Sequence, residues 1–145
     1  MTLTAEVRAA RDAVVREHMD SENRQDFEAT MATFAHPRYE LIATGEVYDG
    51  EDAVREYYAR SRSTFADQRN EVIAIHHADD GVFVEFDLLG THTGALAGYE
   101  PTGREFRCRM VALFLFADEP TSGDRISCER VYFDSGTILR QLGLI

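Results

Sequence analysis

The sequence predicts a single α+β domain in which helices come first and a β-sheet follows. Apolar side chains recur at helical spacing over roughly the first 65 residues, and from residue 70 they recur at every second position. The chain has 145 residues, a length typical of one domain with one core. Helices that precede a run of strands are typical of α+β folds, so we expect one domain over residues 1–145.

Three helices are expected in the first half of the chain. Apolar residues at helical spacing predict a first helix over residues 4–19. A second, shorter helix from Phe27 to Phe34 is expected to end before His36-Pro37, because proline disfavours helical conformation in the preceding residue. The acidic turn at 49–52 predicts the start of a third helix, whose apolar face extends to Phe65.

The second half of the chain is expected to supply most of the sheet. Five segments are expected to be strands: 39–43, 71–77, 82–91, 105–116 and 125–133. The sequence Ala78-Asp79-Asp80-Gly81 is typical of a hairpin turn, and a second turn is expected around residues 118–124. One or two helical turns over 137–142 close the chain.

Composition excludes several classes of partner. The formal net charge is −11, and such a surface repels phosphate backbones and anionic lipids, so we expect neither nucleic acid nor membrane as a partner. No apolar run approaches the ~18 residues that span a bilayer. The first residues lack the basic and apolar regions of a secretory signal, so a cytoplasmic location is expected.

Neither a disulfide nor a metal site is expected. In the expected hairpin Cys108 lies opposite Phe133 and Cys128 opposite Leu113, which separates the two cysteines by roughly 17 Å, beyond the ~7 Å limit for a disulfide. We therefore expect free thiols. The neighbouring His76-His77 residues face opposite sides of a strand and cannot bind one metal together.

The last strand carries the candidate catalytic residues. Arg130, Tyr132 and Asp134 share one strand face, while Val131 and Phe133 share the other. In an enclosed apolar pocket burial would raise the pKa of Asp134, so that its carboxylate could remove a proton next to a carbonyl. Tyr132 or Arg130 could then stabilise the enolate oxygen. The alternative is that Asp134 caps the final helix.

Other polar residues have both a structural and a functional interpretation. His92 lies where a strand gives way to a loop, so it either lines the rim of a pocket or stabilises the turn. Arg109 is expected either to join cross-strand ion pairs or to line a cavity with its polar neighbours; that set is Glu85, Asp87, Arg107 and Arg109. Phe27, Tyr57 and Tyr58 lie on apolar helical faces and are expected in the core, although Tyr58 and Tyr48 could reach a pocket.

Two stretches resemble a known family. The first is Gly90-Thr91-His92-Thr93-Gly94, followed by Pro101-Thr102-Gly103-Arg104, and the second is Tyr132-Phe133-Asp134, followed by Arg140-Gln141-Leu142-Gly143. They resemble the SnoaL-like polyketide cyclases, also called ester cyclases, of the nuclear transport factor 2-like superfamily. The Tyr48-Asp49-Gly50 step and the element order fit the same family.

The resemblance implies a cone-shaped fold with N-terminal helices packed on a highly curved mixed, mostly antiparallel sheet. It further implies an internal pocket for a small apolar or aromatic molecule and a homodimer through the outer face of the sheet. No metal or organic cofactor is implied. The acid/base aspartate of the family's cyclases corresponds to Asp134 here. Many relatives carry Trp at the position of Arg130, so an added cation would alter what the pocket accepts.

Three functions stay open. The first is a cofactor-independent cyclase, isomerase or lyase acting on an apolar carbonyl compound, with Asp134 as acid/base and Tyr132, Arg130 and His92 orienting the substrate. The second is epoxide hydrolysis with water positioned by Arg130 and Asp134. The third is a ligand-binding or dimer scaffold protein without catalysis, because this fold hosts many functions.

Overall fold

The computed structural model describes residues 3–116 and 123–145. Its elements are α1 (Ala5–Asn23), α2 (Phe27–Ala32), β1 (Arg38–Leu41), β2 (Glu46–Asp49), α3 (Glu51–Thr64), β3 (Arg69–His77), β4 (Gly81–Thr91), β5 (Glu105–Leu115), β6 (Cys128–Tyr132) and α4 (Ser135–Gln141). Every expected helix and strand is present. Strand β2 was not predicted from the sequence, because two of its four residues, Glu46 and Asp49, are acidic residues that are uncommon in strands.

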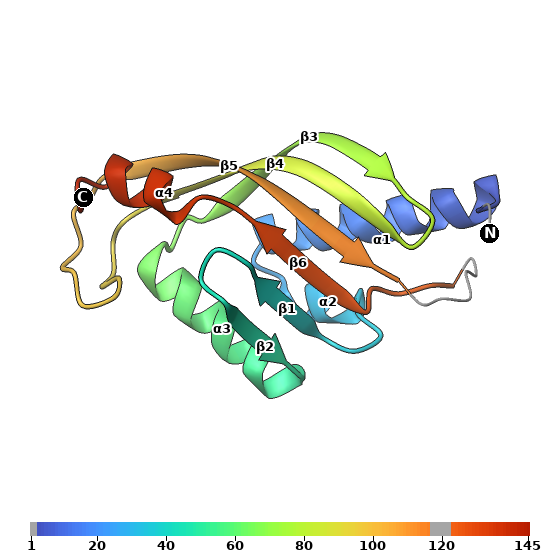
Figure 1. Cartoon of the computed structure of the whole chain (residues 1–145). Helices are drawn as coiled ribbons and strands as arrows, with labels where there is room; N and C mark the ends of the chain where they lie inside the picture. The colour runs from blue at the N-terminus through green and yellow to red at the C-terminus, as the bar shows by residue number, and fades with distance from the viewer. Residues whose placement is uncertain (1–2, 117–122) are drawn as a thin grey trace.

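The six strands form one mixed sheet in the order β2-β1-β6-β5-β4-β3. Strands β1 and β6 run parallel, and the other neighbours are antiparallel. In Figure 1 strands β3, β4 and β5 arch over α1, α2 and α3. A β-bulge between Val72 and Ala74 contributes to the bend of β3. The predicted α+β fold with helices on a curved, mostly antiparallel sheet is thus confirmed.

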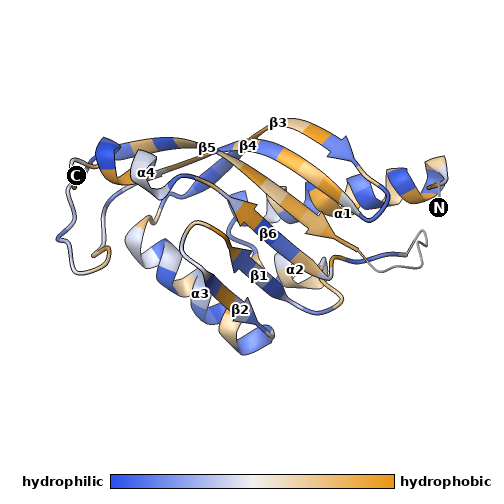
Figure 2. Ribbon diagram, in the orientation of Figure 1, coloured by the Kyte–Doolittle hydropathy of each residue, from blue (hydrophilic) through white to orange (hydrophobic). Residues whose placement is uncertain are grey.

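Side-chain alternation builds the core. Along β5 the residues of even number from Phe106 to Phe114 are buried, while their neighbours are exposed or partly buried. These side chains face the helices together with Val82, Val84 and Phe86 of β4. Figure 2 shows both hydrophobic and hydrophilic residues on α1, as expected for a helix with one buried face. Thr4 caps α1 by accepting a hydrogen bond from the Val7 amide at 3.1 Å.

A tight turn joins β3 to β4 at residues 78–81. His77 pairs with Val82, and the Ala78 amide donates to the Gly81 carbonyl at 2.9 Å, so the predicted hairpin turn is confirmed. Most of the turn expected around 118–124 lies outside the described residues.

Both cysteines are free, as predicted, and both are buried. The strand register differs from the expected one by two residues, since Cys128 lies opposite Leu115 and Arg130 lies opposite Leu113. In the part of the chain that the structure describes, none of the helices combines the length and the apolar character that a bilayer crossing requires.

Candidate functional site

A cavity of about 570 Å³ lies between the sheet and α3, with α4 and the segment 95–97 at its sides. Its wall is mainly apolar, and its principal apolar residues are Leu41, Phe65, Leu88, Leu96, Phe106, Met110, Val131, Phe133, Ile138 and Leu139. A cavity of this size and character is typical of a site for a small organic molecule.

One face of α3 supplies the polar side of the wall. Tyr57, Ser61 and Thr64 follow one another at helical spacing and all line the cavity. Ser61 donates to the Tyr58 carbonyl at 3.1 Å, and Thr64 donates to the Ala95 carbonyl at 3.1 Å. The Tyr57 hydroxyl has no hydrogen-bond partner within residues 3–116 and 123–145. Tyr57 is therefore a free donor on the cavity wall.

Two residues of opposite charge, Glu46 and Arg60, lie on the cavity wall beside Tyr48. The Tyr48 hydroxyl donates to the Glu46 carboxylate and accepts from Arg60. Burial and the Glu46 carboxylate raise the pKa of Tyr48 to about 12, so the phenol stays protonated. The Tyr48 ring stacks on Tyr57 with ring centroids 4.6 Å apart. The structure thus places Tyr48, a predicted ligand contact, in the cavity wall.

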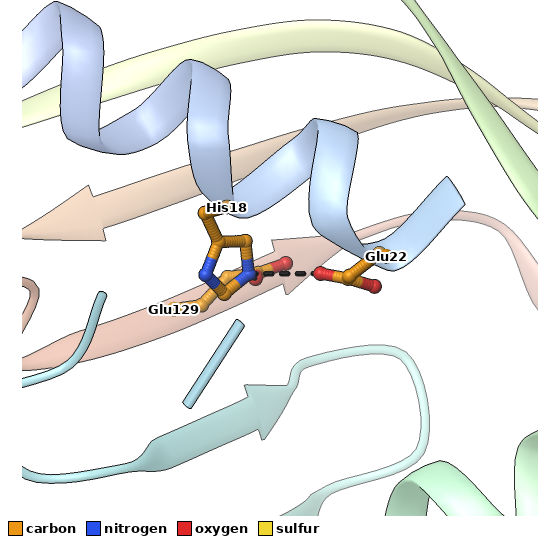
Figure 3. A group of neighbouring side chains, drawn as sticks. All are labelled: His18, Glu22 and Glu129. Atoms are coloured by element: carbon orange, nitrogen blue, oxygen red, sulfur yellow. Dashed lines mark ion pairs between the residues drawn. The ribbon is translucent and has the colours of Figure 1, made fainter. Parts of the chain in front are cut away.

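A buried charged cluster of His18, Glu22 and Glu129 lies between α1 and β6 (Figure 3). His18 Nε2 is 2.7 Å from Oε1 of Glu129 and 2.8 Å from Oε1 of Glu22. Arg62 extends the cluster, with its guanidinium 3.4 Å from Glu22. Two acids and two bases are thus gathered where little water reaches, an arrangement that is costly unless the charges are paired.

Hydrogen bonds fix the orientation of the His18 ring. The Thr33 hydroxyl donates to the Thr30 carbonyl at 2.6 Å, so its oxygen accepts from Nδ1–H of His18 at 2.8 Å. Nε2 then faces the two carboxylates and the Tyr39 hydroxyl, which lies 3.3 Å away and 2.7 Å from the Tyr58 hydroxyl. Both ring nitrogens of His18 therefore meet acceptors.

Burial and the neighbouring charges shift the pKa values of all three groups in the cluster. Burial by itself lowers the pKa of His18, but the Glu129 and Glu22 carboxylates outweigh it and raise that pKa to about 9. Burial raises the pKa of Glu129 against the opposing effect of His18. Burial also acts on Glu22, but His18 and Arg62 outweigh it and lower the pKa of that carboxyl. Glu129 is thus the acid of the cluster with the higher affinity for a proton.

The cluster adjoins the inner end of the cavity. In the parallel pair of strands Tyr39 lies beside Glu129, and Leu41 lies beside Val131. Leu41 and Val131 line the cavity, so the cluster begins two residues further along the same strand faces, or about 7 Å away. Tyr57 stands at the boundary, since it lines the cavity and its ring lies 5.0 Å from that of Tyr39.

The cluster also has the donor types of a divalent-cation site. Donor atoms of His18, Glu22 and Glu129 lie within 4.8 Å of one another. However, Nε2 contacts both carboxylates directly, and Arg62 supplies a second positive charge, so the charges balance without a metal. The expectation that no metal is bound stays a prediction.

Asp134 does not point into the cavity, and the prediction of an inward, tuned carboxylate at this position is wrong. Its side chain is exposed and caps α4, accepting from the Gly136 amide at 3.1 Å and from the Thr137 hydroxyl at 2.9 Å. These hydrogen bonds and Arg140 lower the pKa of the carboxyl. Asp134 therefore has the role that the alternative interpretation gave it, which is to cap the final helix. Its neighbours Phe133 and Ser135 line the cavity.

Arg130 and Tyr132 lie on the outer face of the sheet. Arg130 pairs with Glu40 at 2.6 Å rather than with Asp134, so the arginine–aspartate pair required for the epoxide hydrolase interpretation is not formed. The Tyr132 side chain is 42% exposed. Arg130 and Tyr132 do share one face of β6, as predicted from their alternation along the strand. However, the cavity lies on the other face, which carries Val131 and Phe133.

His92 is fully buried and holds a loop together. Its Nδ1 accepts from the Thr102 amide at 3.1 Å, and its backbone amide donates to the Arg104 carbonyl at 2.9 Å. It is absent from the cavity wall, so the turn-stabilising interpretation fits its contacts and the orienting role does not.

The remaining candidates lie outside the cavity wall. Phe27 stacks on Tyr58 at 4.6 Å, and Tyr58 bonds to the charged cluster through Tyr39. Arg109 bonds to Asp87 at 2.7 Å on the outer face, where Arg107 also bonds to Asp87 at 2.8 Å. The predicted cross-strand ion pairs therefore form around Asp87.

Two signals could have revealed the cluster in the sequence. His18 and Glu22 are four residues apart on the first helix, so they share a helical face. Glu129 shares its strand face with the apolar Val131 and Phe133, which makes it an acid on a buried face. No sequence pattern indicates that these two faces meet, because that contact depends on the parallel pairing of β1 and β6.

Comparison with solved structures shows the fold. A proposed SnoaL-like polyketide cyclase from Jannaschia sp. CCS1 superposes with a TM-score of 0.81 at 16% identity, covering 100% of this chain and 99% of that one. A proposed polyketide cyclase from Xanthomonas campestris pv. campestris gives 0.79 at 19% identity, covering 94% and 98%. IdmH from Streptomyces antibioticus, also a proposed polyketide cyclase, gives 0.75 at 23% identity, covering 92% and 98%.

Sequence comparison identifies the family. A search of curated proteins finds no match to this chain. The model of the SnoaL-like polyketide cyclases, in contrast, matches residues 12–142, which is nearly the whole length. With the curved mixed sheet and the largely apolar cavity already described, this match shows that the chain belongs to the SnoaL-like polyketide cyclase family.

Proposed function

We propose that the protein binds a small, largely apolar carbonyl compound in the cavity and catalyses a cofactor-independent cyclisation or isomerisation of it. The observation that carries the proposal is the unpartnered hydroxyl of Tyr57 on an apolar wall, beside a buried cluster that holds protons. An apolar cavity favours an apolar body, and a free donor favours an oxygen acceptor on that body.

Glu129 replaces Asp134 as the proposed acid/base group. Burial raises the pKa of Glu129. The other carboxyl groups of the described residues that show a shift, Asp134 among them, have a lowered pKa. A base of this kind removes a proton next to the carbonyl, and the electron pair moves onto the carbonyl oxygen. The Tyr57 hydroxyl donates to that oxygen as charge develops there. Burial raises the pKa of Tyr57, so it remains a donor at neutral pH.

A simple ketone tests the acid/base chemistry without knowledge of the natural substrate. The exchange of the acidic protons of 2-tetralone for deuterium is followed by NMR in D₂O. We expect the wild-type protein to accelerate exchange and Glu129→Gln to lose about 10²-fold or more of that acceleration, the range typical of general acid/base groups. Asp134→Asn serves as the matched control and should retain the wild-type rate. Loss of exchange in Asp134→Asn with retention in Glu129→Gln would reverse the assignment.

Ligand binding without catalysis is the second candidate. It is favoured by the position of Glu129, which adjoins the cavity but is not part of its wall. The same experiment separates the two functions. A ketone that binds to the wild-type protein, with exchange no faster than in buffer, would support a binding protein.

A further inference from the structure

A second polar group inside the cavity has no partner and lies apart from Tyr57. Gln68 follows the end of α3, is only 8% exposed and lines the cavity. Its backbone amide donates to the Phe65 carbonyl at 3.1 Å, but its side-chain amide makes no hydrogen bond to any residue that the structure describes. An amide that reaches a cavity without a protein partner can still bond to water, or to a ligand that enters and replaces the water.

The Tyr57 hydroxyl and the Gln68 side-chain amide lie toward opposite ends of α3. From Tyr57 to Thr64 the rise of α3 alone is about 10 Å, and Gln68 lies beyond that point. Tyr57 adjoins Tyr39 and the charged cluster, whereas Gln68 leads into β3 at the other end of α3. A ligand that satisfies both groups is therefore elongated and carries polar atoms at both ends.

The chemistry of the Gln68 side-chain amide limits the kinds of ligand group that can bind to it. Gln68 offers both a donor and an acceptor, which suits a hydroxyl or a carbonyl oxygen. Phe65, whose carbonyl accepts from the Gln68 backbone amide, is apolar, and so is most of the cavity wall, so a charged substituent at Gln68 would be placed in a mainly apolar site. Other polar lining residues are engaged elsewhere, since Ser61 and Thr64 bond to backbone carbonyls. Ser135 is also unpartnered but is only partly buried.

We propose that Gln68 is a specificity residue that selects elongated, largely apolar ligands with a neutral oxygen substituent at the end opposite the carbonyl bound by Tyr57. This inference rests on the proposed function, because it assumes that the ligand carbonyl faces Tyr57. It adds a second recognition point and thereby defines the length and the polarity of the ligand.

A cycle of two ligands and two proteins tests the inference. The ligands are 2-acetylnaphthalene and 6-hydroxy-2-acetylnaphthalene, which differ only in the distal hydroxyl, and the proteins are the wild type and Gln68→Leu. We expect the hydroxyl to improve Kd about tenfold in the wild type and to give no improvement in Gln68→Leu. Isothermal titration calorimetry measures the four constants. If Gln68→Leu unfolds, Gln68→Met replaces it.

The outcomes separate this inference from the function on which it rests. If the hydroxyl changes Kd equally in both proteins, the role of Gln68 is wrong while ligand binding stands. If neither ligand binds to the wild type, the proposed function fails and the role of Gln68 fails with it. A Tyr57→Phe variant that weakens both ligands equally would support the placement of the carbonyl at Tyr57.

Discussion

Nε2 of His18 lies 2.7 Å from Oε1 of Glu129, and this contact joins the first helix to the last strand. Glu22 approaches the same nitrogen at 2.8 Å, so two carboxylates share one imidazole in the protein interior. The protonation of His18 therefore links the acid/base properties of the site to the stability of the fold.

Removing one carboxylate should make the His18 proton easier to lose. In Glu129→Gln only Glu22 remains to stabilise the imidazolium, while burial continues to disfavour it. We expect the pKa of His18 to fall clearly below its present value of about 9. NMR titration of the His18 ring protons measures the change. A His18 pKa that stays near 9 in the variant would contradict the proposed pairing.

Stability should fall as the pH rises through the range in which His18 loses its proton. The pKa of His18 is raised from 6.5 to about 9, so its contribution is fully present below 6.5 and is lost as pH approaches and passes 9. The raised pKa of Glu129 acts in the same direction from its lower ordinary value of 4.5. We expect a loss on the order of 2–3 kcal/mol across that window for the wild type.

Urea unfolding between pH 6 and pH 9.5 measures this dependence. The His18→Gln variant is the comparison, because it removes the titrating ring while keeping a polar side chain. Its unfolding free energy should vary less with pH over the same range. Parallel curves for the two proteins would show that the buried ring does not titrate as described.

Asp134→Asn should have a structural effect rather than a catalytic one. The carboxylate caps α4 through Gly136 and Thr137 and lies near Arg140. We expect a small decrease in melting temperature, because asparagine is also a good N-cap residue and keeps part of these hydrogen bonds. Differential scanning calorimetry measures the decrease. An unchanged melting temperature together with abolished ketone exchange would restore the catalytic interpretation.

We further propose that two copies of the chain associate through the outer face of the sheet. Phe83 and Tyr132 are 37% and 42% exposed on that face, and Phe83 pairs with Leu113 on the adjoining strand. Light scattering after size exclusion should give a dimer for the wild type and a monomer for Phe83→Lys. Ile145→Lys, at an exposed residue that follows α4 and lies outside the sheet, is the control and should remain dimeric. A monomeric wild type would overturn this proposal.

The sequence was sufficient to predict the fold but only part of the site. Helix and strand patterns depend on local spacing, which explains the agreement for α1, α3 and the long strands. Tyr48 lines the cavity, as one of the two interpretations of the tyrosines held, whereas Tyr58 lies in the core and Tyr57, expected in the core, lines the cavity as well. Asp134 was misplaced because a motif identifies a position along the strand but not the side that faces the interior. His18 and Glu129 were missed because no sequence pattern indicates that α1 and β6 lie side by side in the fold.

The parallel pairing of β1 with β6 also affects how the chain reaches its final state. Glu40 of β1 and Arg130 of β6, which pair in this register, are 90 residues apart in the sequence, with four strands and a helix between them. Contacts of such long sequence separation carry a high loop-closure cost and generally slow folding. The charged cluster at His18 therefore depends on completion of a strand pairing between distant parts of the chain, so an amide-exchange pulse during refolding should protect the β3–β4 hairpin before β1.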